Sequence, residues 1–425
     1  MMNKSFESYF DRLWPICRSL TGPGYRQSLE ILSEIMPTER LKFPTGQKVL
    51  DWVVPREWSI RDAYFIDPQG KKHADFKQNN LHILNYSAPF RGTLSFSDLK
   101  PHLYSLPDQP EAIPYLTSYY QERWGFCLPH GELISLPEGK YTVFIDSEQK
   151  DGHLEVGEAV LPGERKEEIL FSSYLCHPSL ANNELSGPLV LAFLYQRVKA
   201  MPKRRFTYRF VILPETIGAI CYLSKRGEHL KKNLLAGYQI TCVGDPGKFT
   251  YKRSRRGDTL ADRAACLLLR GLGPHEVIPF DPSAGSDERQ YGSPGFNLPV
   301  GSLMRTPYGR YPEYHTSLDN KSFIRFEALE ESLEAYAGIV EALEANRVWR
   351  NTVARGEPQL GRRGLYPTLG SQKNTGQKTK ATLWLLNLAD GSRDLLSIAE
   401  QSGQPIKMLI QLAEELRQAG LLVEI

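Results

Sequence analysis

Apolar strand-like runs alternate with helical runs from about residue 165 onwards, and this alternation limits the fold more than any other feature of the sequence. Helical spacing of apolar residues separates the strand-like runs, as in TLADRAACLLLRGL (259–272). Strands that alternate with helices predict an α/β fold with a mostly parallel sheet covered by helices on both faces. The strand-like runs are EILFSSYL (168–175), FTYRFVIL (206–213), GYQITCVG (237–244) and LPVGSLM (298–304).

Different sequence textures flank this alternating region. Between residues 53 and 140, short β-prone pieces are separated by Pro- and Gly-bearing turns, which is typical of a small α+β module. The stretch 351–380 is rich in Gly, Lys, Thr and Gln and predicts a linker. The end of the chain has the element order of a winged helix-turn-helix. We therefore expect an α/β domain in two pieces (1–55 and 141–350) and an inserted α+β domain between them (56–140). A linker (351–380) and a winged helix (381–425) should follow.

The bulk composition excludes several classes of protein. Hydrophobic residues make up 41% of the 425 residues and charged residues 24%, as in ordinary globular proteins. The 52 basic and 49 acidic side chains leave a net charge of +3, so no overall field indicates binding to nucleic acid or to a membrane. The six cysteines are scattered without a CxxC pair, and the N-terminus lacks the pattern of a signal peptide. We expect a cytoplasmic protein with reduced thiols.

Several polar residues fall where the predicted strands end, or in the loop before the last long helix. Each is weak evidence alone, because a lone histidine after a strand is more often structural than a ligand. The carboxyl ends of parallel strands meet at one crevice, however, so these side chains can converge there. The residues are His177 with Asn183 and Glu184, then Glu215, Asp245 and His315.

Imidazole and carboxylate are ligand types that suit zinc, and a catalytic zinc keeps one position open for water. A carboxylate that is not a ligand can then remove a proton from that water. Glu215 is the candidate for this general base, because it follows a strand and precedes a helix in VILPETIG.

Four motifs together resemble the zinc-dependent aminopeptidase superfamily: HPSLANNELSG (177–187), LPETIGA (213–219), GSDERQYGSPG (285–295) and YHTSLDN (314–320). The chain is more closely similar to a bacterial family of aminopeptidase-like proteins, through VPREW (54–58), PYLTSYYQERWGFC (114–127) and RTPYGRYPEYHTSLDN (305–320). That resemblance covers nearly the whole chain. It implies a mixed sheet flanked by helices, a small inserted domain and a C-terminal winged helix, and it links the chain to surface-polysaccharide pathways.

The resemblance assigns roles position by position. His177 matches the first zinc-ligand histidine and His315 the last, while Glu215 matches the general base. Asn183 stands where most relatives have a metal-bridging aspartate, and Thr216 stands where a second glutamate would bind a second zinc.

The strand-end aspartate of the superfamily corresponds either to Asp245 or to Cys242. Glu288 replaces a histidine of the superfamily, and Glu184 and Glu288 are reserve ligands. Two divalent ions close together need several carboxylates to offset their repulsion. The changes at Asn183 and Thr216 remove two of these carboxylates, so we expect one zinc ion, held by His177, His315 and either Asn183 or Asp245.

Three residues near the presumed cleft are candidates for binding substrate: Arg289, Arg305 and Tyr314. The leading hypothesis is a metallohydrolase of the aminopeptidase type, acting on a peptide N-terminus or on an acylated amino-sugar. The alternative is a degenerate hydrolase that binds a ligand or acts as a scaffold through its winged helix. Because the presumed recognition helix PIKMLIQLAEELRQAG (405–420) is nearly neutral, the winged helix is expected to bind protein rather than DNA, and it allows a homo-oligomer.

Overall fold

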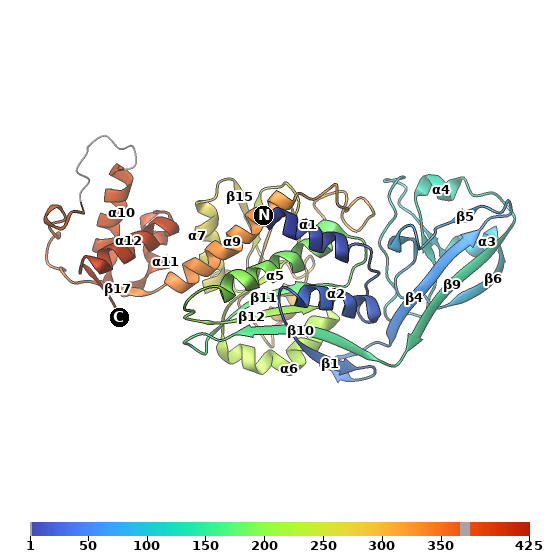
Figure 1. The fold of residues 1–425 in the computed structure, drawn as a ribbon, viewed down its shortest axis with the longest axis horizontal. Helices are drawn as coiled ribbons and strands as arrows, with labels where there is room; N and C mark the ends of the chain where they lie inside the picture. Colours follow the sequence, from blue (N-terminus) through green and yellow to red (C-terminus); the bar gives the residue numbers. More distant parts are fainter. Residues whose placement is uncertain (1, 366–374) are drawn as a thin grey trace.

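The computed structural model describes residues 2–365 and 375–425. Three parts follow one another along the long axis of the molecule: a small β-rich domain, a central α/β domain and a helical C-terminal domain (Figure 1). The central domain contains an eight-stranded sheet with the strand order β1-β10-β12-β11-β13-β16-β14-β15.

The middle of this sheet is parallel and both of its edges contain antiparallel pairs. The parallel strands are β11 (Glu168–Tyr174), β12 (Thr207–Leu213), β13 (Leu234–Ile240) and β16 (Val300–Met304). One edge is built from β10 (His153–Leu161), antiparallel to β12, and β1 (Glu39–Pro44). The other edge has β14 (Phe249–Lys252), antiparallel to β16, and β15 (His275–Ile278). The predicted mixed, mostly parallel sheet is therefore confirmed.

Helices cover both faces of the sheet, which explains why its central strands are apolar throughout. Every residue of β11 is buried, as expected for a strand covered on both sides. One face carries α1 (Met2–Leu13), α2 (Pro23–Ser33), α5 (Ser186–Lys199), α7 (Leu260–Arg270) and α9 (Phe326–Ala345). The opposite face carries α6 (Ile217–Asn233) and the short α8 (Glu288–Tyr291).

The small domain is built on a second, antiparallel sheet with the order β5-β4-β9-β6. Its strands are β4 (Glu57–Ile66), β5 (Lys72–His73), β6 (Phe90–Ser95) and β9 (Lys140–Lys150). Because β9 pairs along its length with β4, this sheet ends at Lys150 rather than at the expected residue 140. The remaining short elements are β2 (Lys48–Val49), β3 (Trp52–Val53), η1 (Asn80–His82), α3 (Phe96–Leu99), η2 (Lys100–His102), β7 (Leu103–Tyr104), β8 (Phe126–Cys127) and α4 (His130–Ile134).

A loop of the small domain is bonded to the loop of the central domain that follows β16. The Tyr115 N–H donates to the His315 carbonyl over 2.8 Å, and the Ser317 N–H donates to the Ile113 carbonyl over 2.9 Å. These backbone bonds fix the inserted domain against one of the residues expected to bind metal.

The C-terminal domain begins directly after α9. Strand β17 (Val348–Asn351) pairs with both β18 (Asp390–Asp394) and β19 (Leu422–Glu424). The helices are η4 (Gly361–Arg363), α10 (Thr375–Leu388), α11 (Leu395–Ser402) and α12 (Ile406–Gln418). This is a winged helix that includes β17, which lies upstream of the expected bounds. The expected linker 351–380 overlaps the start of α10, and its residues 366–374 lie outside the described residues.

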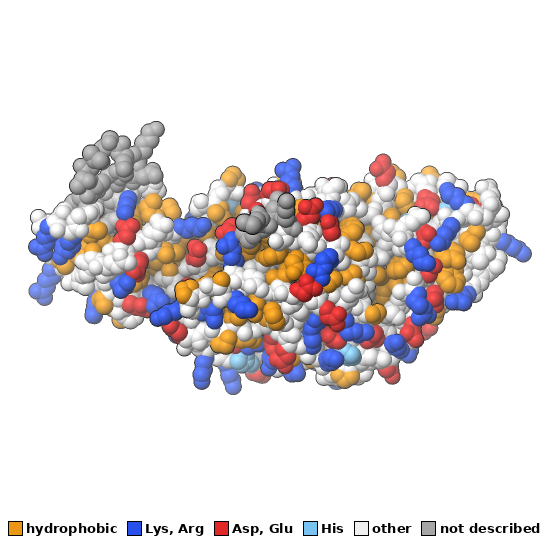
Figure 2. Space-filling view, viewed as in Figure 1, with side chains coloured by type: hydrophobic (Ala, Val, Ile, Leu, Met, Phe, Trp, Pro, Cys, Tyr) orange, Lys and Arg blue, Asp and Glu red, His pale blue; other side chains and the backbone are white. Residues whose placement is uncertain are grey.

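The winged helix is also bonded to the central domain. Arg263 of α7 donates to the carboxylates of Asp394 (3.0 Å) and Glu400 (2.9 Å). Basic and acidic side chains are interspersed over the face of the molecule drawn in Figure 2, in keeping with the small net charge. Among the helices of the described part of the chain, none combines the length and the apolar character needed to span a bilayer.

Candidate active site

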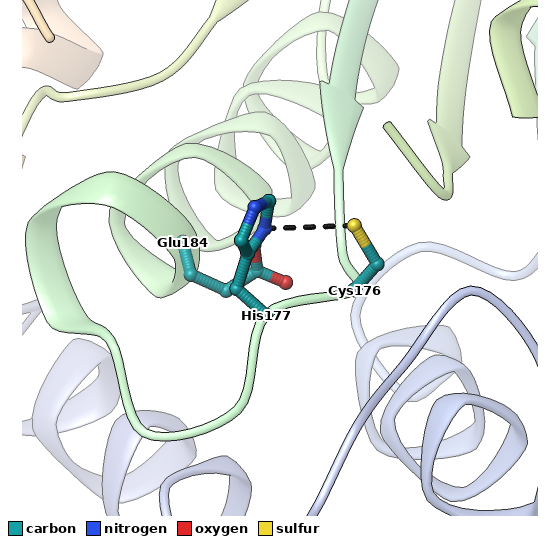
Figure 3. Close-up of side chains that lie close together, drawn as sticks. All are labelled: Cys176, His177 and Glu184. Carbon is teal, nitrogen blue, oxygen red and sulfur yellow. Dashed lines mark hydrogen bonds and ion pairs between the residues drawn. The ribbon is translucent and has the colours of Figure 1, made fainter. Parts of the chain in front are cut away.

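His177 follows β11 directly and is held from behind by a carboxylate. Its Nδ1 lies 2.6 Å from Oε2 of Glu184 and 3.5 Å from Sγ of Cys176, and Figure 3 shows the three side chains grouped together. An ionised carboxylate only accepts hydrogen bonds, so the proton lies on Nδ1 and Nε2 is directed to the other side of the ring. That Nε2 atom lies 3.6 Å from Oε2 of Glu215. A carboxylate bonded to the nitrogen that faces away from the metal, as Glu184 is here, is the usual arrangement of a metal-ligating histidine.

The surroundings of His177 favour a positive charge at this position. Burial lowers the pKa of the imidazole, but Cys176 and Glu184 outweigh that effect and raise the pKa of His177 well above its usual value. Either a proton or a metal ion satisfies this preference.

Behind Glu184 lies a fully buried guanidinium. The Nε of Arg18, in the loop between α1 and α2, is 3.9 Å from Oε1 of Glu184. Cys176, His177 and Glu184 are the one group of possible metal ligands that lies tightly clustered within the described residues. Arg18 already supplies a cation on that side, so a metal between these three side chains would be repelled at short range. The cluster instead orients His177.

Asn183 is presented by a short π-helical turn, η3 (Ala181–Leu185). Single π turns are common at functional sites. The carboxylate of Asp319 accepts the N–H groups of Ala181, Asn182 and Asn183 over 3.2, 2.6 and 2.9 Å, which holds the turn in place. Burial raises the pKa of Asp319 to about 7, although these backbone bonds act to lower it. Asp319 was not among the expected site residues, although it lies inside the YHTSLDN motif.

The helix that follows this turn approaches the sheet very closely. Gly187, in the first turn of α5, lies so near β13 that an added Cβ would be 2.4 Å from the Ile240 carbonyl oxygen and 2.5 Å from Oγ of Ser173. Only glycine fits at this position, which explains the Ser-Gly pair that ends the motif.

The side-chain amide of Asn183 faces His315. Its Nδ2 donates to the Tyr174 hydroxyl over 2.9 Å, so its Oδ1 is the atom that lies 3.1 Å from Nε2 of His315. His315 has a positive φ of 56° and its ring stacks on that of Tyr314 at 3.9 Å. Burial and the neighbouring His177 lower the pKa of His315 to about 3. The ring is therefore neutral, with a lone pair on one nitrogen.

Glu215 sits at the start of a strained turn. Thr216 has φ 61° and ψ −75°, and the Ile217 N–H donates to the Glu215 carbonyl over 2.8 Å, which is the rare γ-turn with positive φ. Such a conformation costs a β-branched residue about 1–3 kcal/mol, and positions of this kind cluster at functional sites. The Thr216 N–H donates to Oδ1 of Asp287 over 2.7 Å, which holds the turn.

The carboxylate of Glu215 is partly exposed, and its hydrogen-bonding capacity is not fully used. Its Oε1 accepts from the Ser286 hydroxyl over 2.6 Å, and its Oε2 faces His177. Burial raises the pKa of Glu215, with Glu184 and Glu288 adding to the rise, while His177 and Ser286 oppose it. A carboxylate with a raised pKa is well suited to accept and return a proton near neutral pH.

Asp245 does not occupy the role of metal ligand predicted for it. Its two oxygens accept from the Gly247 N–H, the Asn182 side chain, and both the N–H and the hydroxyl of Thr306, over 2.6 to 3.1 Å. The acceptor capacity of the carboxylate is used inside its own turn. Cys242, the alternative in the alignment, is the residue that reaches the site, with Sγ 3.9 Å from Nδ2 of Asn183.

The reserve ligands are also engaged elsewhere. Glu288 is fully buried and accepts from Nζ of Lys252 and from the Tyr308 hydroxyl, each over 2.9 Å. Glu184 holds His177 from behind and does not face the pocket.

The three residues expected to bind substrate are not among the residues that line the pocket. Arg305 is buried and donates to the Gly247 carbonyl, to Ser332 and to Glu331, so it holds a loop instead of facing the pocket. Arg289 is half-buried and donates to the Ser286 carbonyl over 3.3 Å. Tyr314 supports the His315 ring by stacking.

The remaining ligand atoms fit one zinc ion. A tetrahedral site with bonds of about 2.1 Å separates neighbouring ligand atoms by about 3.4 Å. The separation of 3.1 Å between His315 Nε2 and Asn183 Oδ1 is close to this value. The two imidazole rings lie 5.4 Å apart. A second ion would lack carboxylate ligands, because the side chains of Asn183, Thr216 and Cys242 are an amide, a hydroxyl and a thiol.

A pocket of about 490 Å³ opens above His177, Glu215 and His315. Its other walls are largely aromatic and aliphatic and come mostly from the small domain. Tyr115 contacts both histidine rings, at 4.9 Å and 5.3 Å. By sequence alone the aromatic stretch YLTSYYQERWGF (115–126) can line a pocket or pack the small domain, and packing is the favoured interpretation; the structure places its first residues at the site. The other lining residues are Leu20, Trp52, Leu116, Thr117, Tyr119, Tyr120, Cys176, Thr216 and Ile217.

The fold of the central domain is that of the zinc aminopeptidases. A solved zinc aminopeptidase from Bacillus subtilis matches with a TM-score of 0.59 at 11% identity, over 80% of this chain and 95% of that chain. The family described as "Domain of unknown function (DUF4910)" matches residues 8–346, and a winged helix-turn-helix family matches residues 347–424. The chain belongs to the DUF4910 family.

Two matches from Clostridium acetobutylicum extend over all or nearly all of the chain. One protein is 42% identical over 413 residues, 97% of this chain and 94% of its own length, and is named as a candidate polysaccharide biosynthesis protein with an aminopeptidase-like domain. A crystal structure of a candidate peptidase from this organism matches with a TM-score of 0.93 at 41% identity, over 100% of this chain and 97% of that chain.

Proposed function

We propose that the chain is a metal-dependent hydrolase of the aminopeptidase type that cleaves a small amide or peptide bond. The observation that carries the proposal is the convergence of His177, Glu215 and His315 on the floor of one pocket. These residues come from three separate segments, and the strained turn at Thr216 orients Glu215. Two imidazoles and one available carboxylate are the side chains that metal-assisted hydrolysis requires.

His177, His315 and the amide oxygen of Asn183 would hold one zinc ion. Bound there, zinc supplies Lewis-acid polarisation of the scissile carbonyl and lowers the pKa of a water molecule to near neutrality. Glu184 keeps the His177 proton on Nδ1, and Tyr174 keeps the Asn183 oxygen directed at the site. An amide oxygen is a weaker zinc ligand than a carboxylate, so the affinity is modest.

Glu215 acts as general base and then as general acid. Oε2 is its freer oxygen, because Oε1 is held by Ser286. The carboxylate takes a proton from the attacking water and delivers it to the leaving nitrogen. The water oxygen bonds to the carbonyl carbon, the C–N bond breaks, and an acid and an amine are released. The raised pKa of Glu215 suits both transfers.

The neutral side chains of Asn183, Thr216 and Cys242 favour a second candidate function. A former hydrolase that binds a ligand or serves as a scaffold through its winged helix would tolerate these changes. The orientation of His177 and the strain at Thr216 argue for the enzyme, because neither arrangement stabilises the fold by itself.

The experiment that separates the two functions compares hydrolysis of acyl p-nitroanilides by the zinc-loaded protein and by its Glu215→Gln variant. We expect turnover that the variant reduces by about 100- to 10,000-fold, as for loss of a general base. Glu148→Gln on the exposed surface of β9 is the control and should leave kcat unchanged. Equal rates in Glu215→Gln and in the unmodified protein would exclude the proposed mechanism.

A further inference from the structure

Charge is scarce in the pocket above the candidate metal ligands. Among the described residues that line it, Glu215 is the one carboxylate. The neighbouring Thr216 offers a hydroxyl at most. Cys242, beside Asn183, is fully buried and is not among the residues that line the pocket. Asp245 is turned into its own loop and bonded there.

The hydroxyl groups that line the pocket are also uncharged. The Tyr115 and Tyr119 hydroxyls lie 2.8 Å apart and are bonded to each other. The Tyr120 hydroxyl donates to the Val53 carbonyl. These groups can hydrogen-bond to a neutral ligand, but they supply no counter-ion for a cation.

A free α-ammonium group is therefore poorly matched to this pocket. The desolvation cost of enclosing a cation without a counter-ion exceeds what a cation–π contact with an aromatic wall returns. Glu215 is no substitute partner, because its freer oxygen is needed for proton transfer and Ser286 holds the other. The balance favours an uncharged group beside the scissile carbonyl.

The mouth of the pocket carries an exposed apolar rim. Trp52 is 40% exposed, Leu116 38% and Tyr120 52%, and all three line the pocket. The Trp52 and Tyr120 rings contact each other at 5.5 Å, and the Tyr120 hydroxyl donates to the Val53 carbonyl over 3.1 Å. Exposed apolar side chains that adjoin a pocket are typical of a binding surface.

We propose that the pocket selects an uncharged substrate, an N-acylated amine with an apolar acyl group, over a substrate with a free α-ammonium group. Trp52 and Tyr120 hold the apolar acyl group at the rim. This inference rests on the proposed hydrolase function and narrows it. Water adds to the acyl carbon, the C–N bond breaks, and the products are an apolar carboxylic acid and an amine that leaves with the proton from Glu215.

A matched pair of anilides tests the selection. L-leucine p-nitroanilide and 4-methylpentanoyl p-nitroanilide differ only in the α-ammonium group. We expect kcat/KM for the acyl compound to be at least about tenfold higher. Equal values, or a preference for the leucine compound, would overturn the selection. Trp52→Ala should lower kcat/KM for the acyl compound by about tenfold, whereas Ile134→Ala, an exposed residue of α4, should not change it. An unchanged value in Trp52→Ala would refute the role of the rim.

A binding measurement keeps this inference separate from the hydrolase proposal. The affinities of the chelator-treated, unmodified protein for 4-methylpentanamide and for L-leucinamide are compared by titration calorimetry, so that Glu215, the one carboxylate among the described lining residues, stays in place. Tighter binding of the uncharged amide by at least about tenfold supports the selection even if neither anilide is hydrolysed. In that case the proposed hydrolase function fails and the selection stands. Tighter binding of L-leucinamide would overturn the selection whatever the catalytic result.

Discussion

The two sides of the candidate site differ in charge. On one side, Arg18, Glu184, His177 and Glu215 form an ionic series that is buried except at Glu215. On the other side, Asn183, Thr216 and Cys242 are neutral and are held by hydrogen bonds or by backbone strain. The charged side retains the groups needed to orient a ligand and to move a proton. The neutral side lacks the carboxylates that a second metal needs, so under the proposed function the contrast favours one metal ion over two.

The largest expected effect comes from removing the cation of the charged side. Arg18→Leu leaves Glu184 buried without its guanidinium and should lower the free energy of unfolding by about 3–5 kcal/mol. Urea unfolding measures the change. Arg12→Leu is the matched control, because Arg12 pairs with Glu34 at the surface, and it should leave the midpoint nearly unchanged. If the two variants unfolded at the same midpoint, the ionic series would not be a structural unit.

The next prediction tests whether Glu184 acts on zinc binding by orienting His177. Glu184→Gln keeps the size of the side chain but removes the carboxylate behind Nδ1, so zinc affinity should fall by about 10- to 100-fold. Competition with a chelator measures the dissociation constant. Glu288→Gln should leave zinc affinity nearly unchanged, because Glu288 pairs with Lys252. A larger fall in Glu288→Gln than in Glu184→Gln would contradict the assignment.

How much of this site could be anticipated depends on where each residue lies. His177 and Glu215 follow buried strands, and parallel strands bring such positions together, so the alternation of strands and helices already predicts their convergence. Asp245 also follows a strand, but its own turn binds its carboxylate. Local hydrogen bonding of this kind cannot be distinguished from ligation by spacing alone.

The contact of the apolar wall with the site and the end of the inserted domain could not be predicted from the sequence, for other reasons. Tyr115 arrives from an inserted domain, and no periodicity indicates which of its loops contacts the central domain. Strand β9 is followed almost at once by β10, which belongs to a different sheet. A single β-rich stretch of sequence therefore contains the boundary, so the predicted end of the insert falls too early.

A smaller effect is expected from restoring charge to the neutral side. Asn183→Asp adds a carboxylate beside His315 and should tighten zinc binding by about tenfold, since a carboxylate is a better zinc ligand than an amide. The ratio of zinc to protein should stay near one, because Thr216 still offers no ligand for a second ion. A ratio near two in this single variant would show that the neutral side does not limit the site to one metal.

The smallest effect concerns the strained turn. Thr216→Gly relieves a positive φ of 61°, worth about 1–3 kcal/mol, but increases the freedom of the unfolded chain by about 0.5–1 kcal/mol. The free energy of unfolding should therefore rise slightly, by about 1 kcal/mol, while kcat falls because Glu215 is less firmly directed. Thermal unfolding and the anilide assay measure the two quantities. Higher stability with an unchanged kcat would separate the strain from catalysis.

The most direct test of the central claim is the zinc stoichiometry of the purified full-length protein after dialysis against micromolar zinc, measured by elemental analysis. We expect about one zinc ion per chain and a value near zero in His177→Ala and His315→Ala, because both imidazoles converge on one position. A full complement of zinc in either histidine variant, or no zinc in the unmodified protein, would contradict the one-metal site.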